Sequence, residues 1–143
     1  MVKTGLITID SSNEVPEFID ITDQVQEEVG KSGAREGSVL VYSRHTTASI
    51  VLQEPEENLA KDLQNLLKKI APKDNDYHHT AAPDHVEDRQ PNGHSHCQHL
   101  FLGSSETIPF VDGKLMLGTF QRIFLVELDR ARTREIVVQV SGE

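Results

Sequence analysis

The amino-acid sequence predicts an α+β fold with an antiparallel, sandwich-like β core and two to three flanking helices. Three observations support this class. Most apolar segments are short and rich in β-branched residues, one longer segment has helical periodicity, and consecutive C-terminal strands are joined by short turns. Strands connected so closely run antiparallel, and helices packed beside such a sheet define the α+β class. The length of 143 residues predicts a single domain, residues 1–143, with a core of its own.

The N-terminal part is expected to contain short strands around one helix. Two β-branched runs, Leu6–Ile9 and Phe18–Ile21, are bounded by polar residues in the way that strands are. Asp23 opens a capping-box pattern, and Gly33 suits the end of the helix that follows. Two further apolar strands are expected at residues 38–42 and 49–52.

The strongest helical signal follows Pro55, a residue type that is common in the first turn of helices. Apolar residues recur there every three or four positions, as they do on one helix face: Leu59, Leu63, Leu66, Leu67 and Ile70. We expect this stripe to belong to the core, and we expect Pro72 to end the helix.

The second half combines a long loop with a β-rich end. No periodicity is visible from Lys73 to about His94, and loops of this length inside a domain are usually functional. A short helix is expected from Ser95 to Leu102, where Gly103 stops it. The remaining strands are expected at 107–111 and 114–117, around the hairpin turn Asp112-Gly113, and at 119–128 and 134–141.

Composition restricts the classes of function. The chain has 14 Lys and Arg against 23 Asp and Glu, and this net charge of −9 argues against a nucleic-acid partner bound through phosphate contacts. The apolar runs are far shorter than the roughly 20 residues of a transmembrane helix, so no membrane partner is expected. Cys97 is the only cysteine and no signal peptide is visible, which predicts a cytoplasmic protein.

Six of the seven histidines lie between residues 78 and 99. A catalytic zinc commonly takes three protein ligands and a water, so His79, His94 and His96 are candidate ligands of a divalent metal such as zinc. If the segment around His94 is extended, His94 and His96 point to one face. If it is helical, His96 and His99 share a face instead.

Further groups are candidates to complete such a site. The additional candidate ligands are His45, His85 and Cys97. The carboxylates that lie near in sequence, as a base or as partners of the ligands, are Asp84, Glu87 and Asp88. The competing interpretation is a polar surface loop that is rich in histidine and binds no metal.

A second candidate region begins at His45, at the end of a predicted strand. Thr47 and Ser49 follow it with hydroxyl groups that suit a phosphate, although such residues also satisfy the backbone at strand ends. Glu54 is either a catalytic base or the cap of the following helix. Gln121, on a predicted apolar strand face, either bonds across strands or lines a pocket.

Three segments are characteristic in combination: His45-Thr46-Thr47-Ala48-Ser49, the loop from Tyr77-His78-His79 to Asn92-Gly93-His94-Ser95-His96, and Leu117-Gly118-Thr119-Phe120-Gln121-Arg122. In this order they resemble the YjbQ family, whose members are often labelled secondary thiamine-phosphate synthases. The resemblance covers nearly the whole chain, up to Val138-Gln139-Val140-Ser141-Gly142.

This resemblance implies a homotrimer with a histidine-rich, metal-containing site near subunit boundaries. It implies an enzyme that joins a pyrimidine diphosphate to a thiazole phosphate and releases pyrophosphate, so a small phosphorylated substrate is expected. The residues that match the family segments are then His45, Glu54 and Gln121 as catalytic groups, with Thr47 and Ser49 as phosphate-binding groups. Many family members carry acidic residues where this chain has 91–95, and His94 is expected as an extra ligand there.

Two other functions suit the same residues. One is a metal-dependent hydrolase, in which zinc lowers the pKa of a bound water. The other is a non-catalytic, trimeric metabolite-binding protein whose histidines tie the long loop to a neighbouring subunit. The chain is too short for a (β/α)₈ barrel of about 250 residues, so a synthase of that fold is excluded.

Overall fold

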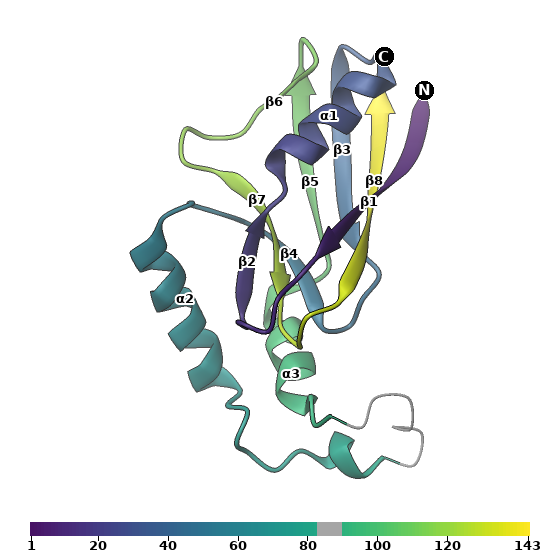
Figure 1. Cartoon of the computed structure of the whole chain (residues 1–143). Helices are drawn as coiled ribbons and strands as arrows, with labels where there is room; N and C mark the ends of the chain where they lie inside the picture. Colours follow the sequence, from purple (N-terminus) through teal and green to yellow (C-terminus); the bar gives the residue numbers. More distant parts are fainter. Residues whose placement is uncertain (83–89) are drawn as a thin grey trace.

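The computed structural model describes residues 1–82 and 90–143. Its framework consists of two antiparallel sheets (Figure 1). The larger sheet contains, in spatial order, β1 (Val2–Asp10), β8 (Thr133–Gly142), β3 (Glu36–Ser43), β5 (Ser105–Val111) and β6 (Lys114–Leu115). The smaller sheet contains β2 (Glu17–Asp20), β7 (Arg122–Glu127) and β4 (Ala48–Gln53). These pairings confirm the predicted α+β class with an antiparallel, sandwich-like core.

The helical segments of the described chain are α1 (Thr22–Ser32), α2 (Glu57–Ile70), the short 3₁₀ helix η1 (His78–Ala81) and α3 (Gly93–Leu102). Within the described residues, no helix is long and apolar enough to cross a membrane. Two local predictions are confirmed by the backbone. Gly33 ends α1 in the left-handed conformation, with φ of 77°, and the hairpin turn Asp112-Gly113 has positive φ at both residues. The candidate residues Asp84, His85, Glu87 and Asp88 lie outside the described residues.

The main core lies between the two sheets and is closed on one side by α1. Every bordering element contributes buried apolar side chains to it, among them Val25, Val39, Ile50, Phe110, Leu125 and Val138. On β7, Ile123 faces this core, while Phe124 and Val126 face a second apolar cluster that includes Leu67 of α2. Both faces of β7 are therefore covered, which explains why its sequence is a continuous apolar run.

The expectation that the stripe of α2 belongs to the core was wrong for most of its length. Of the five stripe residues only Leu67 is buried, whereas Leu66 is 53% exposed and Ile70 is 40% exposed. Gln64 anchors the helix, because its Nε2 donates to the carbonyl of Pro16 at 2.8 Å. Helical periodicity predicts an apolar face, but it does not predict that a partner in the same chain covers that face.

The last strand before the C-terminal turn is shorter than expected. The prediction of a strand over 119–128 places Gln121 on an apolar strand face, and that placement was wrong. Gln121 instead closes a turn, in which its N–H donates to the carbonyl of Gly118 at 3.0 Å and its Oε1 accepts from the Gly118 N–H at 2.9 Å. Gln121 therefore belongs to the turn, and the strand begins only at Arg122.

Candidate functional site

The histidine-rich segments meet at one end of the molecule, where α3 and η1 lie beyond the ends of the strands (Figure 1). Ser95 Oγ donates to the carbonyl of Leu128 at 2.6 Å, and Asn92 Nδ2 donates to Asp129 Oδ2 at 3.3 Å. The Leu128 N–H in turn donates to the carbonyl of Thr47 at 3.1 Å. We call this region the histidine end, and it comprises residues 44–47, 77–81, 92–99 and 127–135.

Helix α3 begins at Gly93, two residues earlier than expected, so the segment around His94 is helical rather than extended. Residues two apart on a helix point in diverging directions, and His94 and His96 are separated in this way. His94 is buried, and its ring lies 6.5 Å from that of Tyr77. Gly93 is required at this start because an added Cβ would lie only 2.5 Å from the Cβ of Tyr77.

The structure brings His79 of η1 together with His96 of α3. Their rings lie edge to face, with centroids 4.6 Å apart and planes inclined by 72°. His94, the third expected ligand, is turned away from this pair, and its Nε2 lies 3.3 Å from Ser95 Oγ. Within residues 1–82 and 90–143, no three His, Cys, Asp or Glu side chains are placed to hold a metal ion together.

The other candidate ligands of this region lie elsewhere on its surface. The imidazole of His99 is bonded to Ser104, with Nε2 3.1 Å from the hydroxyl oxygen. Cys97 is a free, exposed thiol on α3. His96 and His99 both lie on α3, one turn apart as in the helical alternative, but the ring of His99 is bonded to Ser104 while the ring of His96 contacts His79 of η1.

A buried ion pair adjoins the loop that carries His45. Arg134 is 2% exposed and Glu127 is fully buried, and the contact from Nε to Oε1 measures 2.8 Å. Arg134 also donates to Thr47 Oγ1 at 2.9 Å, so the Thr47 hydroxyl serves this pair. Ser49 is fully buried in the core, and its hydroxyl has no partner among the described residues. Neither hydroxyl that was expected to bind phosphate faces the solvent.

His45 is held against strand β8. Its Nε2 lies 3.2 Å from both the N–H and the carbonyl oxygen of Glu135. Burial lowers the pKa of His45 below its ordinary value of 6.5, and the nearby positive charge of Arg134 lowers it further. The imidazole is therefore mostly neutral near pH 7 and able to accept a proton.

Glu54 and Gln121 lie far from His45 within the chain. Gln53 pairs with Arg122 across β4 and β7, so the next residues outward, Glu54 and Gln121, share one end of this pair of strands. His45 precedes the other end of β4, and a six-residue strand is about 20 Å long. The structure does not bring the three expected catalytic residues together in one chain.

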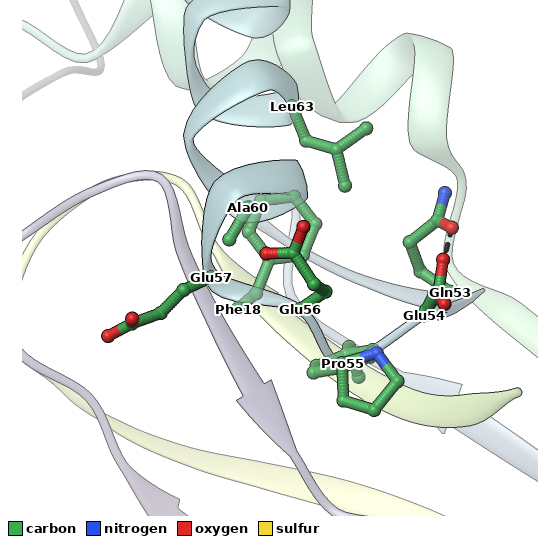
Figure 2. Close-up of a pocket in the computed structure, with 9 residues that line it drawn as sticks. Phe18, Gln53, Glu54, Pro55, Glu56, Glu57, Ala60 and Leu63 are labelled. Atoms are coloured by element: carbon green, nitrogen blue, oxygen red, sulfur yellow. Dashed lines mark hydrogen bonds between the residues drawn. The ribbon is translucent and has the colours of Figure 1, made fainter. Parts of the chain in front are cut away.

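Glu54 stands at the rim of a pocket rather than at the start of the helix. Figure 2 shows Glu54 and Gln53 among the residues that line a cavity of about 230 Å³. The Oε1 of Gln53 accepts from the Glu54 N–H at 3.0 Å. The helix cap is Glu56, whose carboxylate accepts from the first N–H groups of α2, so the interpretation of Glu54 as the cap was wrong. Glu54, Glu56 and Glu57 give this rim a negative charge, which disfavours a phosphate group there.

The buried pair of Glu127 and Arg134 was missed in the sequence. A signal for it exists, because Glu127 ends the apolar run of β7 and Arg134 sits at an alternating inward position of β8. A charged residue in a core register is seldom buried without a partner. The packing of Gly93 on Tyr77 leaves no comparable signal in the sequence.

The lowered histidine pKa values predict a loss of stability in mild acid. Burial lowers the pKa of His45 and of His99, so the unfolded chain binds more protons than the folded chain as the pH falls through 6.5. We expect the free energy of unfolding, measured by urea denaturation with chelator present, to be lower at pH 5.5 than at pH 7.5. The double variant H45Q/H99Q should show a shallower dependence, and an unchanged dependence would contradict this assignment.

The chain is a small α+β protein built on two antiparallel sheets, and its contacting histidines His79 and His96 lie at one end of them. A family model described as "UPF0047 protein YjbQ-like" matches residues 6–143, and the chain belongs to this family. A UPF0047 protein of Methanothermobacter thermautotrophicus is 39% identical over 142 residues, which cover 99% of this chain and 94% of that protein. The UPF0047 protein YugU of Bacillus subtilis is 30% identical, over 88% of this chain and 90% of its own length.

Solved structures show the same architecture. A crystal structure of a YbjQ-like protein of unknown function from Sulfolobus solfataricus has a TM-score of 0.85 and 37% identity, with 100% of both chains covered. An uncharacterized conserved protein of the yjbq/upf0047 family from Clostridium acetobutylicum has a TM-score of 0.82 and 35% identity, over 95% of this chain and 98% of its own.

Proposed function

We propose that the chain is an enzyme that acts on a small phosphorylated metabolite, with an activity of the thiamine-phosphate synthase type, at the histidine end. The observation that supports this most is the contact of His79 with His96, 4.6 Å between ring centroids. The His79 side chain is exposed and that of His96 is partly exposed, so the pair is not a core contact. Two accessible imidazoles from different elements suit the binding of a cation or the movement of a proton.

The histidine pair would supply two of the ligands of a divalent cation. The two imidazoles would hold it, and within the described residues no third His, Cys, Asp or Glu is placed to complete the coordination. Positions would remain for water and for phosphate oxygens of a substrate, as in a catalytic rather than a closed structural centre. When bound, the cation would supply positive charge that attracts a phosphorylated substrate to a chain of net charge −9.

His45 is the proposed acid or base. Its lowered pKa leaves the imidazole neutral near pH 7, and a neutral imidazole can take up a proton. Thr47 would act as a positioning residue, because the bond from Arg134 to its hydroxyl at 2.9 Å fixes the loop that carries His45. In the coupling reaction these groups would bind and orient the pyrimidine diphosphate while its pyrophosphate leaves.

A homotrimer would bring the separated candidates together. Glu54 and Gln121 lie about 20 Å along β4 from His45, so they can approach a histidine end only across a subunit boundary. Large apolar side chains are exposed at both of these ends: Leu100 and Phe101 on α3, and Phe120 beside Gln121. A head-to-tail contact between two different surfaces forms a closed ring when the rotation between neighbouring subunits is one third of a turn, as in a trimer, and exposed apolar patches are typical of interaction surfaces.

The test measures metal content and turnover on the purified, untagged chain. We expect elemental mass spectrometry to find a divalent metal close to stoichiometric with the chain, and we expect the pyrimidine diphosphate and thiazole phosphate to be coupled. His79→Ala and His96→Ala should each lower both quantities by about tenfold or more, since even outer-shell partners of metal ligands are worth 10–100-fold.

His78→Ala is the matched control, because His78 is an exposed neighbour in η1 and lies outside the pair. Unchanged metal content and turnover in both His79→Ala and His96→Ala would contradict the proposal. Zinc-stimulated hydrolysis of phosphoesters without any coupled product would favour the hydrolase. A histidine-dependent change of assembly, with no turnover of any substrate, would favour the non-catalytic binding protein.

A further inference from the structure

Helix α2 carries an apolar stripe beside the face that attaches it to the rest of the chain. The attached face is marked by buried Leu67 and by Gln64, whose Nε2 donates to the Pro16 carbonyl at 2.8 Å. The stripe lies about 100° around the helix from this face, at about 100° per residue. We call it the lateral stripe, and its members are Leu59, Leu63, Leu66 and Ile70. Leu66 is 53% exposed and Ile70 is 40% exposed, so the second half of the stripe is open to solvent.

The spacing of the lateral stripe is that of a helix packed along a second helix. Its members follow one another at intervals of four, three and four residues. These are the intervals between the a and d positions of a coiled coil, whose seam repeats about every 3.5 residues. Helix α2 stands at the margin of the molecule (Figure 1), so a second helix can approach it along its length. The stripe therefore has the pattern and the accessibility of a helix–helix contact.

The charges of α2 determine which kind of helix fits this stripe. Asp62 and Lys69 flank the stripe on the side away from the attached face. Both are exposed, and neither forms an ion pair within the described part of the chain. Glu57 lies in the first turn, and Lys68 lies with Lys69 in the last turn. Charges at the ends also complement the helix dipole, but Asp62 lies in the middle of α2, beyond its reach. A helix that is acidic at its start and basic at its end is complementary to an antiparallel copy of itself.

We infer that the lateral stripe of α2 binds the same stripe of a second copy of this chain, with the two helices antiparallel about a two-fold axis. A two-fold contact uses the same surface on both copies, so the surface must be complementary to itself. The lateral stripe meets this requirement in its apolar pattern and in its charges. The inference depends neither on the proposed activity nor on the proposed trimer, whose exposed apolar side chains lie on α3 and beside Gln121.

The antiparallel arrangement fixes the register of the contact. Leu59 faces Ile70 of the second copy, and Leu63 faces Leu66 of the second copy. In this register Asp62 is two residues, or about 3 Å along the axis, from the level of Lys69 of the second copy. A lysine side chain spans this offset, so an ion pair flanks the apolar seam on each side of the two-fold axis.

The length of α2 sets the strength of the contact. Its 14 residues make a helix about 21 Å long. A contact between two such helices is at the small end of specific interfaces, so we expect a dissociation constant of about 10–100 µM for one pair of helices. Where the chain is a trimer, the same contact joins two rings, and several contacts made at once tighten the assembly.

The first test is disulfide formation in the full chain with Cys97→Ser, which removes the natural thiol. The further substitutions L59C/I70C should give a covalent dimer under mild oxidation, because the register places position 59 beside position 70 of the second copy. Within one chain these positions are about 16 Å apart along the helix, too far for a disulfide. L59C alone and I70C alone are the controls and should stay uncrosslinked. No covalent dimer of the L59C/I70C variant, or equal cross-linking of either single variant, would overturn the antiparallel contact.

The second test is sedimentation equilibrium of the full chain at low ionic strength, from about 5 to 500 µM. We expect the weight-average mass to rise toward twice that of the dilute species. Leu66→Glu, at a position that is already 53% exposed, should abolish the rise without unfolding the chain, as circular dichroism would verify. Equal masses of the natural chain and Leu66→Glu at the highest concentration would overturn the inference.

Charge reversal tests the register in the same experiment. Asp62→Lys and Lys69→Asp should each weaken association by about fivefold or more, because each replaces two attractive pairs with two repulsive ones. The double variant D62K/K69D should recover the affinity of the natural chain. Lys61→Asp is the matched control, since it makes the same charge change on the opposite, exposed side of α2. Equal losses in Lys61→Asp and Lys69→Asp, or no recovery in D62K/K69D, would overturn the inferred register.

Discussion

Arg134→Ala is expected to lower the free energy of unfolding by about 3–5 kcal/mol, because it leaves a buried carboxylate without its cation. Arg134 is 2% exposed and Glu127 is fully buried, and two contacts of 2.8 and 2.5 Å join them. After the substitution, Ser11 Oγ at 2.6 Å and the N–H of Asp129 at 3.2 Å are the remaining donors to Glu127. They compensate the charge only partly.

The loss is measured by guanidinium denaturation at one fixed protein concentration, followed by circular dichroism. Arg44→Ala is the control, because it removes a comparable pair, Arg44 with Glu135 at 2.9 Å, whose side chains are each about half exposed. An exposed pair contributes less than about 1 kcal/mol. Equal losses for Arg134→Ala and Arg44→Ala would show that burial does not decide the effect.

The double variant E127M/R134M tests the cause of this loss. It removes both charges and keeps side chains of similar length in the core. Replacing a buried ion pair with apolar residues is often neutral or stabilising, so we expect the double variant to recover most of the stability that Arg134→Ala loses. A double variant as unstable as the single one would mean that the hydrogen bonds of the pair to Thr47, Ser11 and Asp129, rather than the unpaired charge, carry the effect.

Gly93→Ala is expected to destabilise the fold by about 1–3 kcal/mol, as overpacking does. The added methyl would lie 2.5 Å from the Cβ and 2.6 Å from the Cγ of Tyr77, so η1 and α3 must move apart. Alanine is favoured over glycine in helices by about 1 kcal/mol, and the steric conflict must exceed this gain. Tyr77 precedes η1, which carries His79, so if the proposed cation is bound by His79 and His96 the variant should retain less of it than the natural chain.

Gly30→Ala in α1 is the matched control for this prediction. Its added Cβ meets nothing within 4 Å, so it should gain about 0.5–1 kcal/mol from helix propensity alone. Chemical denaturation of both variants and elemental analysis of Gly93→Ala provide the measurements. If Gly93→Ala is as stabilising as Gly30→Ala, the contact with Tyr77 does not restrain the start of α3.

The histidine pair shows how far the sequence predicts the site. The cluster of histidines predicts that His79, His94 and His96 share one site, and the structure places the rings of His79 and His96 in contact. It does not predict that His94 is turned away from this pair. That outcome depends on whether α3 begins at Gly93 or at Ser95, and the bonds of Ser95 and Asn92 to the turn after β7 favour the earlier start.

Local chemistry is enough to determine much of the fold from the sequence. The hairpin at Asp112-Gly113, the end of α1 at Gly33 and the β-branched strands all follow from backbone preferences within a few residues. The α+β class follows from the short connections between strands. These features involve interactions between near neighbours in the chain, which a sequence displays directly.

Only the tertiary structure decided which distant residues meet. It buries Glu127 with Arg134, leaves most of the α2 stripe exposed, and sets His45 about 20 Å along β4 from Glu54. The physical reason is that these outcomes depend on strand register and on how whole elements pack, and periodicity carries no information about either. An apolar face, a carboxylate or an imidazole has the same sequence signature whether its partner is the same chain, a ligand or another subunit.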